Sequence, residues 1–479
     1  MKKLFTVFVS VCVCSLMLPV FANASQDEPT MKELMAEIKS LKNRVVELET
    51  KLGEQGTSLK KIEKAGYIDD LRDKHQKPHG DVDTLIDEKE EERSVSEALS
   101  VEPAMPGDFK IGADITAIIQ SSPDTHLLGG RSEGKTAGSY QANVTIANEF
   151  RKVNGMALAN LRIDQGHGVE QYLTVYSNVD NNVWNDDQFS LSEMFYEQRL
   201  LDDKIVIDFG KLDPTVFFDL NKYAGSDTTQ FLARIFNNSP VIEFPDNAGG
   251  ITASIYPEKW CQLGYLVISG DPALSRLGSE LFHLAHIGVR PKVYGREGTY
   301  RFETWLNTNP HTRWDDVKKD NEYAYGFSLS FDQEVTDEIG VFTKFGWQDP
   351  KVYNPARTAN VSEDAILNTS PDINNFSLEY MWSAGLQIKG GLWGRKKDVY
   401  GIALGQVMPS GDMKDALSSS SGNGRKAKDE THFETYYNIY ANKYLGISPG
   451  VQLIWDPYGA DSGSQEMISV YTLRAHVDF

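Results

Sequence analysis

An alternation of apolar and polar residues with a period of two begins near Asp108 and continues to the end of the chain. This alternation restricts the possible folds of the chain more than any other feature of the sequence. Segment 251–255 reads Ile-Thr-Ala-Ser-Ile. Segment 299–307 places apolar residues on one face and mostly polar residues on the other, namely Tyr300, Phe302 and Leu306 against Arg301, Glu303, Trp305 and Asn307. Because successive side chains of a strand point to opposite sides of a sheet, the pattern predicts an all-β domain over residues 108–479.

Segment 191–200 follows the alternation less cleanly. Glu193, Glu197 and Arg199 share one predicted face, but they share it with Leu191 and Phe195. In a soluble sandwich such a polar face would meet water, whereas in a membrane barrel it would line the lumen while the apolar face meets lipid. The mean hydropathy of −0.40 excludes only a bundle of membrane-spanning helices, because alternation hides the apolar face of a barrel in the average.

The connections between the predicted strands fall into two classes. Short turns occur at 201–204, 257–259 and 295–298, and long polar stretches occur at 121–138, 177–188, 309–321 and 410–429. Short turns on one side and long loops on the other are typical of bacterial outer-membrane barrels. We therefore expect a transmembrane barrel of about 16 antiparallel strands in residues 108–479.

The last predicted strand is amphipathic and closes on an aromatic residue. Its apolar face alternates with polar residues and consists of Tyr471, Leu473, Ala475, Val477 and Phe479. This ending resembles the signal by which the barrel assembly machinery recognises outer-membrane barrels. Phe479 is therefore the predicted assembly signal, in a protein of the bacterial outer membrane in contact with its lipid.

The N-terminus has the pattern of a secretory signal peptide. Lys2 and Lys3 precede an apolar run from Leu4 to Phe21, and Ala22-Asn23-Ala24 supplies small residues at the cleavage positions. A membrane anchor is the alternative reading. Removal of residues 1–24 leaves Cys261 as the single cysteine, so the processed chain can form no internal disulfide and no multi-thiolate metal site.

Residues 25–66 contain an apolar seam that repeats in alternating steps of three and four. The seam residues are Met31, Leu34, Ile38, Leu41, Val45, Leu48, Leu52, Gln55, Leu59 and Ile62. This period of 3.5 predicts a coiled coil that joins copies of the chain into a homo-oligomer, and the alternative is one amphipathic helix docked on its own domain. Residues 67–107 are acidic and poor in large apolar residues, which indicates a solvated linker.

Charge excludes some partners. The whole chain has 48 Lys and Arg against 68 Asp and Glu, a net charge of −20, which argues against nucleic acid as a partner. Residues 108–479 alone hold 33 Lys and Arg against 48 Asp and Glu. Because a phosphate channel needs rings of Arg and Lys, this balance disfavours one.

Several local motifs resemble the carbohydrate-selective porin family. They are Ser-Glu-Met-Phe-Tyr-Glu-Gln at 192–198, Ile-Asp-Phe-Gly-Lys-Leu-Asp at 207–213, Phe-Asp-Leu-Asn-Lys-Tyr-Ala at 218–224, Gln-Phe-Leu at 230–232, Glu-Thr-Tyr-Tyr-Asn at 434–438, Ile-Ser-Pro-Gly-Val-Gln at 447–452 and the closing strand. The resemblance covers about residues 108–479. It implies a sixteen-stranded outer-membrane channel that passes sugars into the periplasm by facilitated diffusion. Some relatives carry a coiled coil after a surface-layer-type domain, and this sequence shows no such domain.

A sugar channel needs polar partners for hydroxyl groups, aromatic faces for the ring, and binding weak enough to release the solute. Segment 213–247 combines these residue types beside a strand end, which predicts the constriction. The candidate pore-lining residues are Asp213, Phe217, Asp219, Asn221, Arg234, Asn237 and Asn238, with Glu193, Glu197 and Arg199 as wall residues. The alternative for the phenylalanines, Phe217 and Phe218 among them, is that they only anchor a folded loop.

The sequence also leaves function classes other than a sugar porin open. A general diffusion porin without sugar preference and an envelope tether that uses the coiled coil are the alternatives. A hydrolase is disfavoured because the one Gly-x-Ser-x-Gly match, at 130–134, lies in a polar loop without a following helix. No enzyme activity, cofactor or metal is expected. His283 and His286 would face opposite sides of a strand, and a calcium loop at Asp180, Asn182, Asp186 and Asp187 lacks the required glycine and glutamate, so solvated surface is predicted there.

Overall fold

The computed structural model describes residues 108–125, 134–182, 188–272, 278, 280–355, 375–419, 425–461 and 467–479. The predicted signal peptide (1–24), coiled coil (25–66) and linker (67–107) lie outside these residues. The Gly-x-Ser-x-Gly match lies outside them as well except for Gly134, and so do Asp186 and Asp187.

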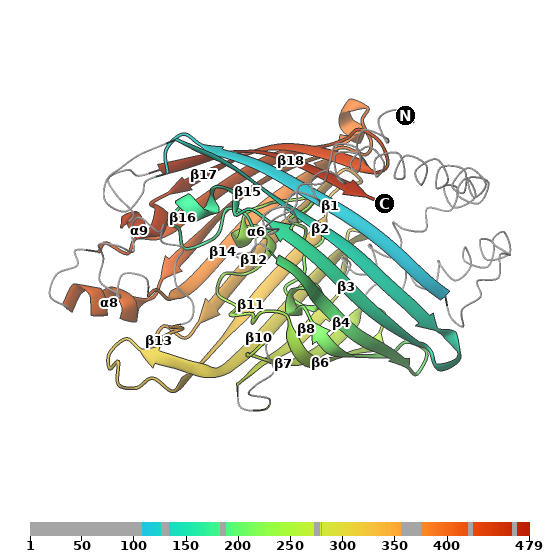
Figure 1. Cartoon of the computed structure of the whole chain (residues 1–479), viewed down its shortest axis with the longest axis horizontal. Helices are drawn as coiled ribbons and strands as arrows, with labels where there is room; N and C mark the ends of the chain where they lie inside the picture. The colour runs from blue at the N-terminus through green and yellow to red at the C-terminus, as the bar shows by residue number, and fades with distance from the viewer. Residues whose placement is uncertain are drawn as a thin grey trace, which may run out of the picture. The chain divides into compact units, whose positions relative to one another are not determined.

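The described residues form one antiparallel sheet that closes on itself (Figure 1). Eighteen strands are present, of which β9 (Lys292–Val293) and β13 (Val352–Tyr353) have only two residues each. The other sixteen are β1 (Asp108–Ser122), β2 (Lys135–Phe150), β3 (Gly155–Gln165), β4 (Gln188–Leu200), β5 (Ile205–Leu212), β6 (Ala248–Glu258), β7 (Cys261–Ser269), β8 (Leu281–Val289), β10 (Arg296–Arg313), β11 (Glu322–Glu334), β12 (Ile339–Gln348), β14 (Leu378–Lys389), β15 (Val399–Pro409), β16 (Glu430–Tyr440), β17 (Leu445–Trp455) and β18 (Met467–Asp478). The predicted barrel of about sixteen strands is confirmed.

The closing strand joins the barrel to its first strand. Strand β1 pairs with β2 on one side and with β18 on the other, where Tyr471 lies opposite Ser121 and Val477 opposite Ile115. The Phe479 N–H donates to the Ala113 carbonyl at 2.8 Å. The amphipathic C-terminal strand therefore completes the hydrogen bonding of β1, and the ring of strands has no open edge.

Helices in the described part of the chain are short. They are α5 (Pro214–Phe217), α6 (Arg234–Asn237), α8 (Gly411–Ser419) and α9 (Pro457–Ala460), with the 3₁₀ turns η2 (Arg151–Val153), η3 (Gly168–Tyr172) and η5 (Gly390–Trp393). None of the helices in these ranges has the length and apolar character needed to cross a membrane.

The connections divide between the two ends of the barrel as the sequence indicated. Short turns, such as 201–204 between β4 and β5, lie at the end where β1 begins and β18 finishes. In this turn Leu201, Asp202 and Asp203 all have positive φ, at 56°, 53° and 63°, which reverses the chain within four residues. The longer connections, including 213–247 and 410–429, start from the opposite end.

The two faces of the strands differ in polarity as predicted. On β10 the outward-facing Phe302 is 41% exposed, while Arg301, Glu303 and Asn307 are buried toward the interior. Leu191 is an exception to the predicted faces. The register of β4 against β3 shifts between the pairs Asn160–Glu193 and Leu161–Leu191, so a bulge at Ser192 moves Leu191 away from the face of Glu193.

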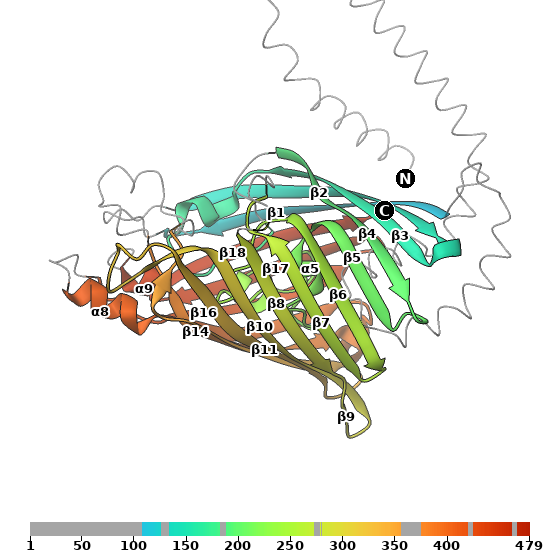
Figure 2. The ribbon, with the colours of Figure 1, turned by 90° about the horizontal axis from the view of Figure 1, so that it is seen from below.

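Two connections fold back into the barrel and fill part of it. Residues 213–247, here called the inner loop, carry α5 and α6, which lie within the ring of strands (Figures 1 and 2). Residues 166–182 pack Val169, Leu173 and Val179 against β17 and β18. The prediction of solvated surface at Asp180 and Asn182 is wrong: both are buried, because the neighbouring valines draw this segment inward.

Candidate solute path inside the barrel

The inner loop starts with a capped helical turn. Asp213 caps α5: its Oδ1 accepts hydrogen bonds from the Thr215 N–H at 2.9 Å and from the Thr215 hydroxyl at 2.6 Å. Pro214 occupies the first helical position, which needs no N–H donor. The local sequence therefore turns the chain at the end of β5 and directs it into the barrel.

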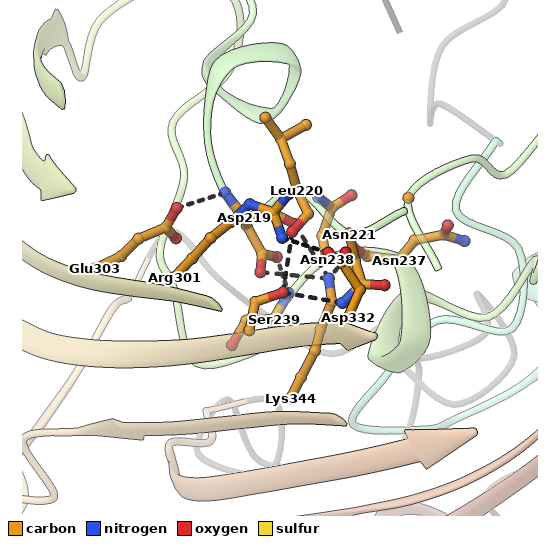
Figure 3. A network of polar contacts seen from close by, with 12 residues as sticks. Asp219, Leu220, Asn221, Asn237, Asn238, Ser239, Arg301, Glu303, Asp332 and Lys344 are labelled. Atoms are coloured by element: carbon orange, nitrogen blue, oxygen red, sulfur yellow. Dashed lines mark hydrogen bonds and ion pairs between the residues drawn. The ribbon is translucent and has the colours of Figure 1, made fainter. Parts of the chain in front are cut away.

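A buried ion pair holds the loop to the wall. Lys344 on β12 points at the loop, and its Nζ lies 3.3 Å from Asp219 Oδ1 (Figure 3). The same ammonium donates to the Asp219 carbonyl at 3.1 Å and to the Asn237 carbonyl at 2.5 Å. Asp219 Oδ2 accepts the Ser239 N–H at 2.5 Å, so one cation and one carboxylate tie together the two ends of the loop.

Further wall residues complete this network. Glu303 on β10 accepts the Asp219 N–H at 2.9 Å and contacts His286 Nδ1 at the same distance. Asn221 donates from Nδ2 to the Ser330 hydroxyl at 3.1 Å. Burial raises the pKa of the Asp219 carboxyl to about 6, since desolvation and the nearby Glu303 outweigh the opposing effect of Lys344.

Apolar contacts anchor the rest of the loop. Phe217 and Phe218 are buried in a cluster with Phe195 and Trp305 of the wall. Phe231 and Phe236 pack in a second cluster, where the Phe231 ring centroid lies 5.0 Å from that of Tyr436. These contacts match the packing alternative that the sequence left open for the phenylalanines.

Glu434 on β16 clamps the middle of the loop. Its two carboxylate oxygens accept the N–H groups of Leu232 at 2.7 Å and Ala233 at 2.8 Å. Arg474 on β18 donates to the carbonyls of Asp227 at 2.6 Å and Gln230 at 2.8 Å. Charged wall residues thus satisfy backbone groups that the barrel would otherwise bury without partners.

A cavity of about 230 Å³ remains between the inner loop and the wall formed by β1 to β4. Its lining is rich in amides and hydroxyls. The amide side chains are Gln141, Asn143, Asn160, Asn181, Asn237, Asn238 and Asn247, and the hydroxyl side chains are Thr145, Ser192, Thr215, Ser226 and Thr228. Phe479 is the single aromatic residue among the lining residues of the described chain.

The charges around the cavity are mostly negative. The lining includes Asp114, Glu193, Asp213, Asp227 and Asp478, with Arg162 as the one Lys or Arg among the described lining residues. Arg162 Nε lies 3.0 Å from Asp164 Oδ1, so this cation is already paired. Among the residues that the structure describes, no group of three or more His, Cys, Asp and Glu could hold a metal ion.

The structure brings together four of the residues that the sequence singled out. Glu193, Asp213, Asn237 and Asn238 line the cavity. Four others lie in the loop without lining it in the described chain, namely Phe217, Asp219, Asn221 and Arg234. The backbone N–H of Arg234 donates to the Asn178 carbonyl at 3.0 Å, which joins the two inward segments.

Glu197 and Arg199 lie on the inner face of β4, nearer the short turns. Arg199 Nε contacts Glu197 Oε1 at 2.6 Å, and Glu197 lies opposite Asp208 on β5. The contribution of these two residues to solute contact stays a prediction.

Sequence reasoning missed the wall of β1 to β3. Asn143, Asn160 and Arg162 line the cavity, and they alternate with apolar residues such as Val144 and Leu161. The same alternation that predicted strands would have placed these polar residues in a lumen. Other strands have polar faces too, however. Only the position of the inner loop shows that the cavity lies beside β1 to β4.

Residues 135–479 match the family described as carbohydrate-selective porin, OprB family. No curated protein sequence matches the chain. The high-pH structure of Pseudomonas putida OprB is 16% identical, with a TM-score of 0.64, and the match covers 81% of this chain and 96% of that one. The outer-membrane channel DcaP of Acinetobacter baumannii is 11% identical, with a TM-score of 0.48 over 79% of this chain and 99% of that one.

The family match covers most of the chain, and the likeness to Pseudomonas putida OprB independently shows the same barrel fold. The outward apolar face and the closed ring of strands are those of a protein that spans an outer membrane. The chain therefore belongs to the carbohydrate-selective porin family and is a porin of the bacterial outer membrane.

Proposed function

We propose that the protein carries small carbohydrates across the outer membrane by facilitated diffusion through the cavity beside the inner loop. The observation that carries the proposal is the cavity lining, in which amide, hydroxyl and carboxylate groups predominate. Amide and hydroxyl side chains both donate hydrogen bonds to sugar hydroxyls and accept them, and carboxylates accept them. The family match supports the same solute class.

The cavity size favours a small solute. Its volume of about 230 Å³ is below the roughly 300–1,000 Å³ of sites for drug-sized ligands. A monosaccharide suits a space of this size better than an oligosaccharide. The aromatic faces expected for a sugar ring are limited to Phe479 in the described lining, so polar groups make most of the contact with the solute.

We assign different tasks to the predicted site residues. Glu193, Asp213, Asn237 and Asn238 contact the solute, because they line the cavity. The residues Phe217, Asp219, Asn221 and Arg234 hold the inner loop, and Glu197 with Arg199 forms the lumen wall toward the periplasm. In this assignment the loop residues affect transport by setting the width of the path.

Uptake into proteoliposomes tests the proposal against the general diffusion porin. We expect liposomes to swell faster in glucose than in a neutral amino acid of similar size, and we expect glucose to reduce the current in single-channel recordings. Equal swelling rates and an unaffected current would favour a general porin without sugar preference.

For the N-terminal part we propose a removed signal peptide at 1–24, a coiled coil at 25–66 that joins copies of the chain, and a solvated linker at 67–107. The heptad seam supports this proposal. Deleting residues 25–107 should leave sugar uptake intact and should reduce the oligomer in cross-linking experiments. Detachment of the envelope in the deletion strain would instead favour a tether as the role of the coil.

A further inference from the structure

We propose that the cavity contains a subsite for a primary ammonium group, formed by Glu193, Asp213 and Asn237, so that the channel favours amino sugars over neutral sugars. The inference rests on the proposed sugar transport and deepens it by naming a solute class. It starts from two buried acceptors in the cavity wall whose hydrogen bonding is incomplete.

The first acceptor is Glu193 on β4. Its side chain is enclosed by the wall and the inner loop, since the residue is 8% exposed, yet it lines the cavity. Oε2 accepts a long hydrogen bond of 3.4 Å from Asn160 Nδ2, whereas Oε1 has no hydrogen-bond partner in the described part of the chain. A buried carboxylate with an unmatched oxygen is costly, and a cation at this oxygen would offset that cost.

The second acceptor is Asn237 at the end of α6. The residue is 3% exposed, and it too lines the cavity. Its Nδ2 donates to the Phe231 carbonyl, and its own carbonyl accepts from Lys344 Nζ at 2.5 Å, so both contacts fix the position of the residue. Its Oδ1 finds no hydrogen-bond partner among the described residues.

The third member is Asp213, the cap of α5. Its Oδ1 is occupied by Thr215, and its carboxylate is close enough to Glu193 for the two charges to interact. An ammonium group has three donors and no acceptor, which matches three oxygen acceptors from Glu193, Asp213 and Asn237. Arg162 Nε contacts Asp164 Oδ1, and its guanidinium is also near enough to Glu193 to stabilise the charge of that carboxylate in part.

The rest of the lining selects among cationic solutes. A zwitterionic amino acid would bring its carboxylate toward Asp114 and Asp227, which repel it. An amino sugar carries hydroxyl groups in place of that carboxylate, and the surrounding amides suit hydroxyl groups. A metal ion is the weaker candidate, since no cluster of three or more ligating side chains occurs in the described ranges.

The test is uptake of labelled glucosamine and labelled glucose into proteoliposomes that contain the full chain, with the membrane potential held at zero by potassium and valinomycin. Below saturation we expect glucosamine to enter about tenfold faster than glucose, the effect of one charge-assisted hydrogen bond. E193Q should bring this ratio close to one, because it removes the charge that favours the ammonium group and keeps the shape of the side chain. D213N should lower the ratio as well.

E258Q is the matched control, because it removes the same charge from an exposed residue at the end of β6. It should keep the wild-type ratio. Equal uptake of glucosamine and glucose by the wild type would overturn the subsite. An equal loss of preference in E193Q and E258Q would overturn it as well, because the overall negative charge of the protein would then attract glucosamine. Failure of sugar transport itself is a separate result: glucose would then enter no faster than a neutral amino acid of similar size. Heat-modifiable electrophoretic mobility checks that each variant is folded.

Discussion

Lys344 and Asp219 form an ion pair that is completely buried between the barrel wall and the inner loop. The Nζ–Oδ1 distance is 3.3 Å, and neither side chain is reached by solvent. The two residues lie 125 positions apart in the sequence. Because the same ammonium also binds the carbonyls of Asp219 and Asn237, this contact fixes the part of the loop that borders the cavity.

Replacing Lys344 by Met should loosen the inner loop and destabilise the barrel. Removing one partner of a buried ion pair typically costs about 3–5 kcal/mol, since the remaining charge is left buried. Thermal unfolding in detergent, followed by heat-modifiable mobility, should show a lower midpoint, and single-channel recordings should show a larger and noisier current. The matched control is K414M, which breaks the partly exposed pair with Asp429 and should cost less than about 1 kcal/mol. Equal effects of K344M and K414M would contradict the assigned role.

Asp219 should make stability depend on pH. Its pKa is about 6 in the folded chain because burial disfavours the charge, and the ordinary value is 3.8. Between these values the folded state keeps a proton that the unfolded state has lost. The protonated Asp219 therefore stabilises the folded state fully below about pH 4, and this contribution to the free energy of unfolding is lost as pH rises through about 6. Midpoints measured from pH 4 to 7 should fall more in the wild type than in D219N, and identical pH profiles would refute this explanation.

E434A should free the middle of the inner loop. The substitution leaves the buried N–H groups of Leu232 and Ala233 without their acceptor, at about 1–3 kcal/mol for each group. We expect more frequent current fluctuations and faster protease cleavage in residues 225–235. E434Q, which keeps one acceptor oxygen, should lie between E434A and the wild type. The control E322A, at the start of β11, should leave both readouts unchanged, and wild-type behaviour of E434A would show that the clamp is dispensable.

Deleting Phe479 should lower the amount of folded protein in the outer membrane, because we propose that this residue is the assembly signal. Immunoblots of membrane fractions, read as the ratio of folded to unfolded bands, measure the effect. M467A, at the opposite end of β18, is the control and should assemble normally. Normal assembly after the deletion would show that Phe479 is not the assembly signal, although β18 still closes the barrel.

The sequence predicted those parts of the structure that depend on local alternation. The faces of 299–307, the closing strand and the strand number all follow from a period of two, because each residue of a strand has only two sides to choose between. Leu191 departs from its predicted face because a single bulged residue reverses the alternation, and nothing in the local pattern marks the bulge.

Contacts inside the barrel were harder to predict from sequence. The segment 213–247 was identified from its composition, but the partners of Asp219 come from β10 and β12, far along the chain. The burial of Lys344 could not be predicted either, because a lysine on a strand is usually solvated. Asp180 was expected at the surface because polar residues there outnumber the valines that bury the segment.

We propose that solutes pass through the cavity between the inner loop and the wall of β1 to β4. The most direct test is glucose-driven liposome swelling with N160W, which fills the cavity, compared with A159W, whose side chain lies on the other face of the same strand. We predict that N160W reduces the swelling rate at least several-fold and that A159W leaves it unchanged. Swelling of folded N160W at the wild-type rate would show that sugars take another path.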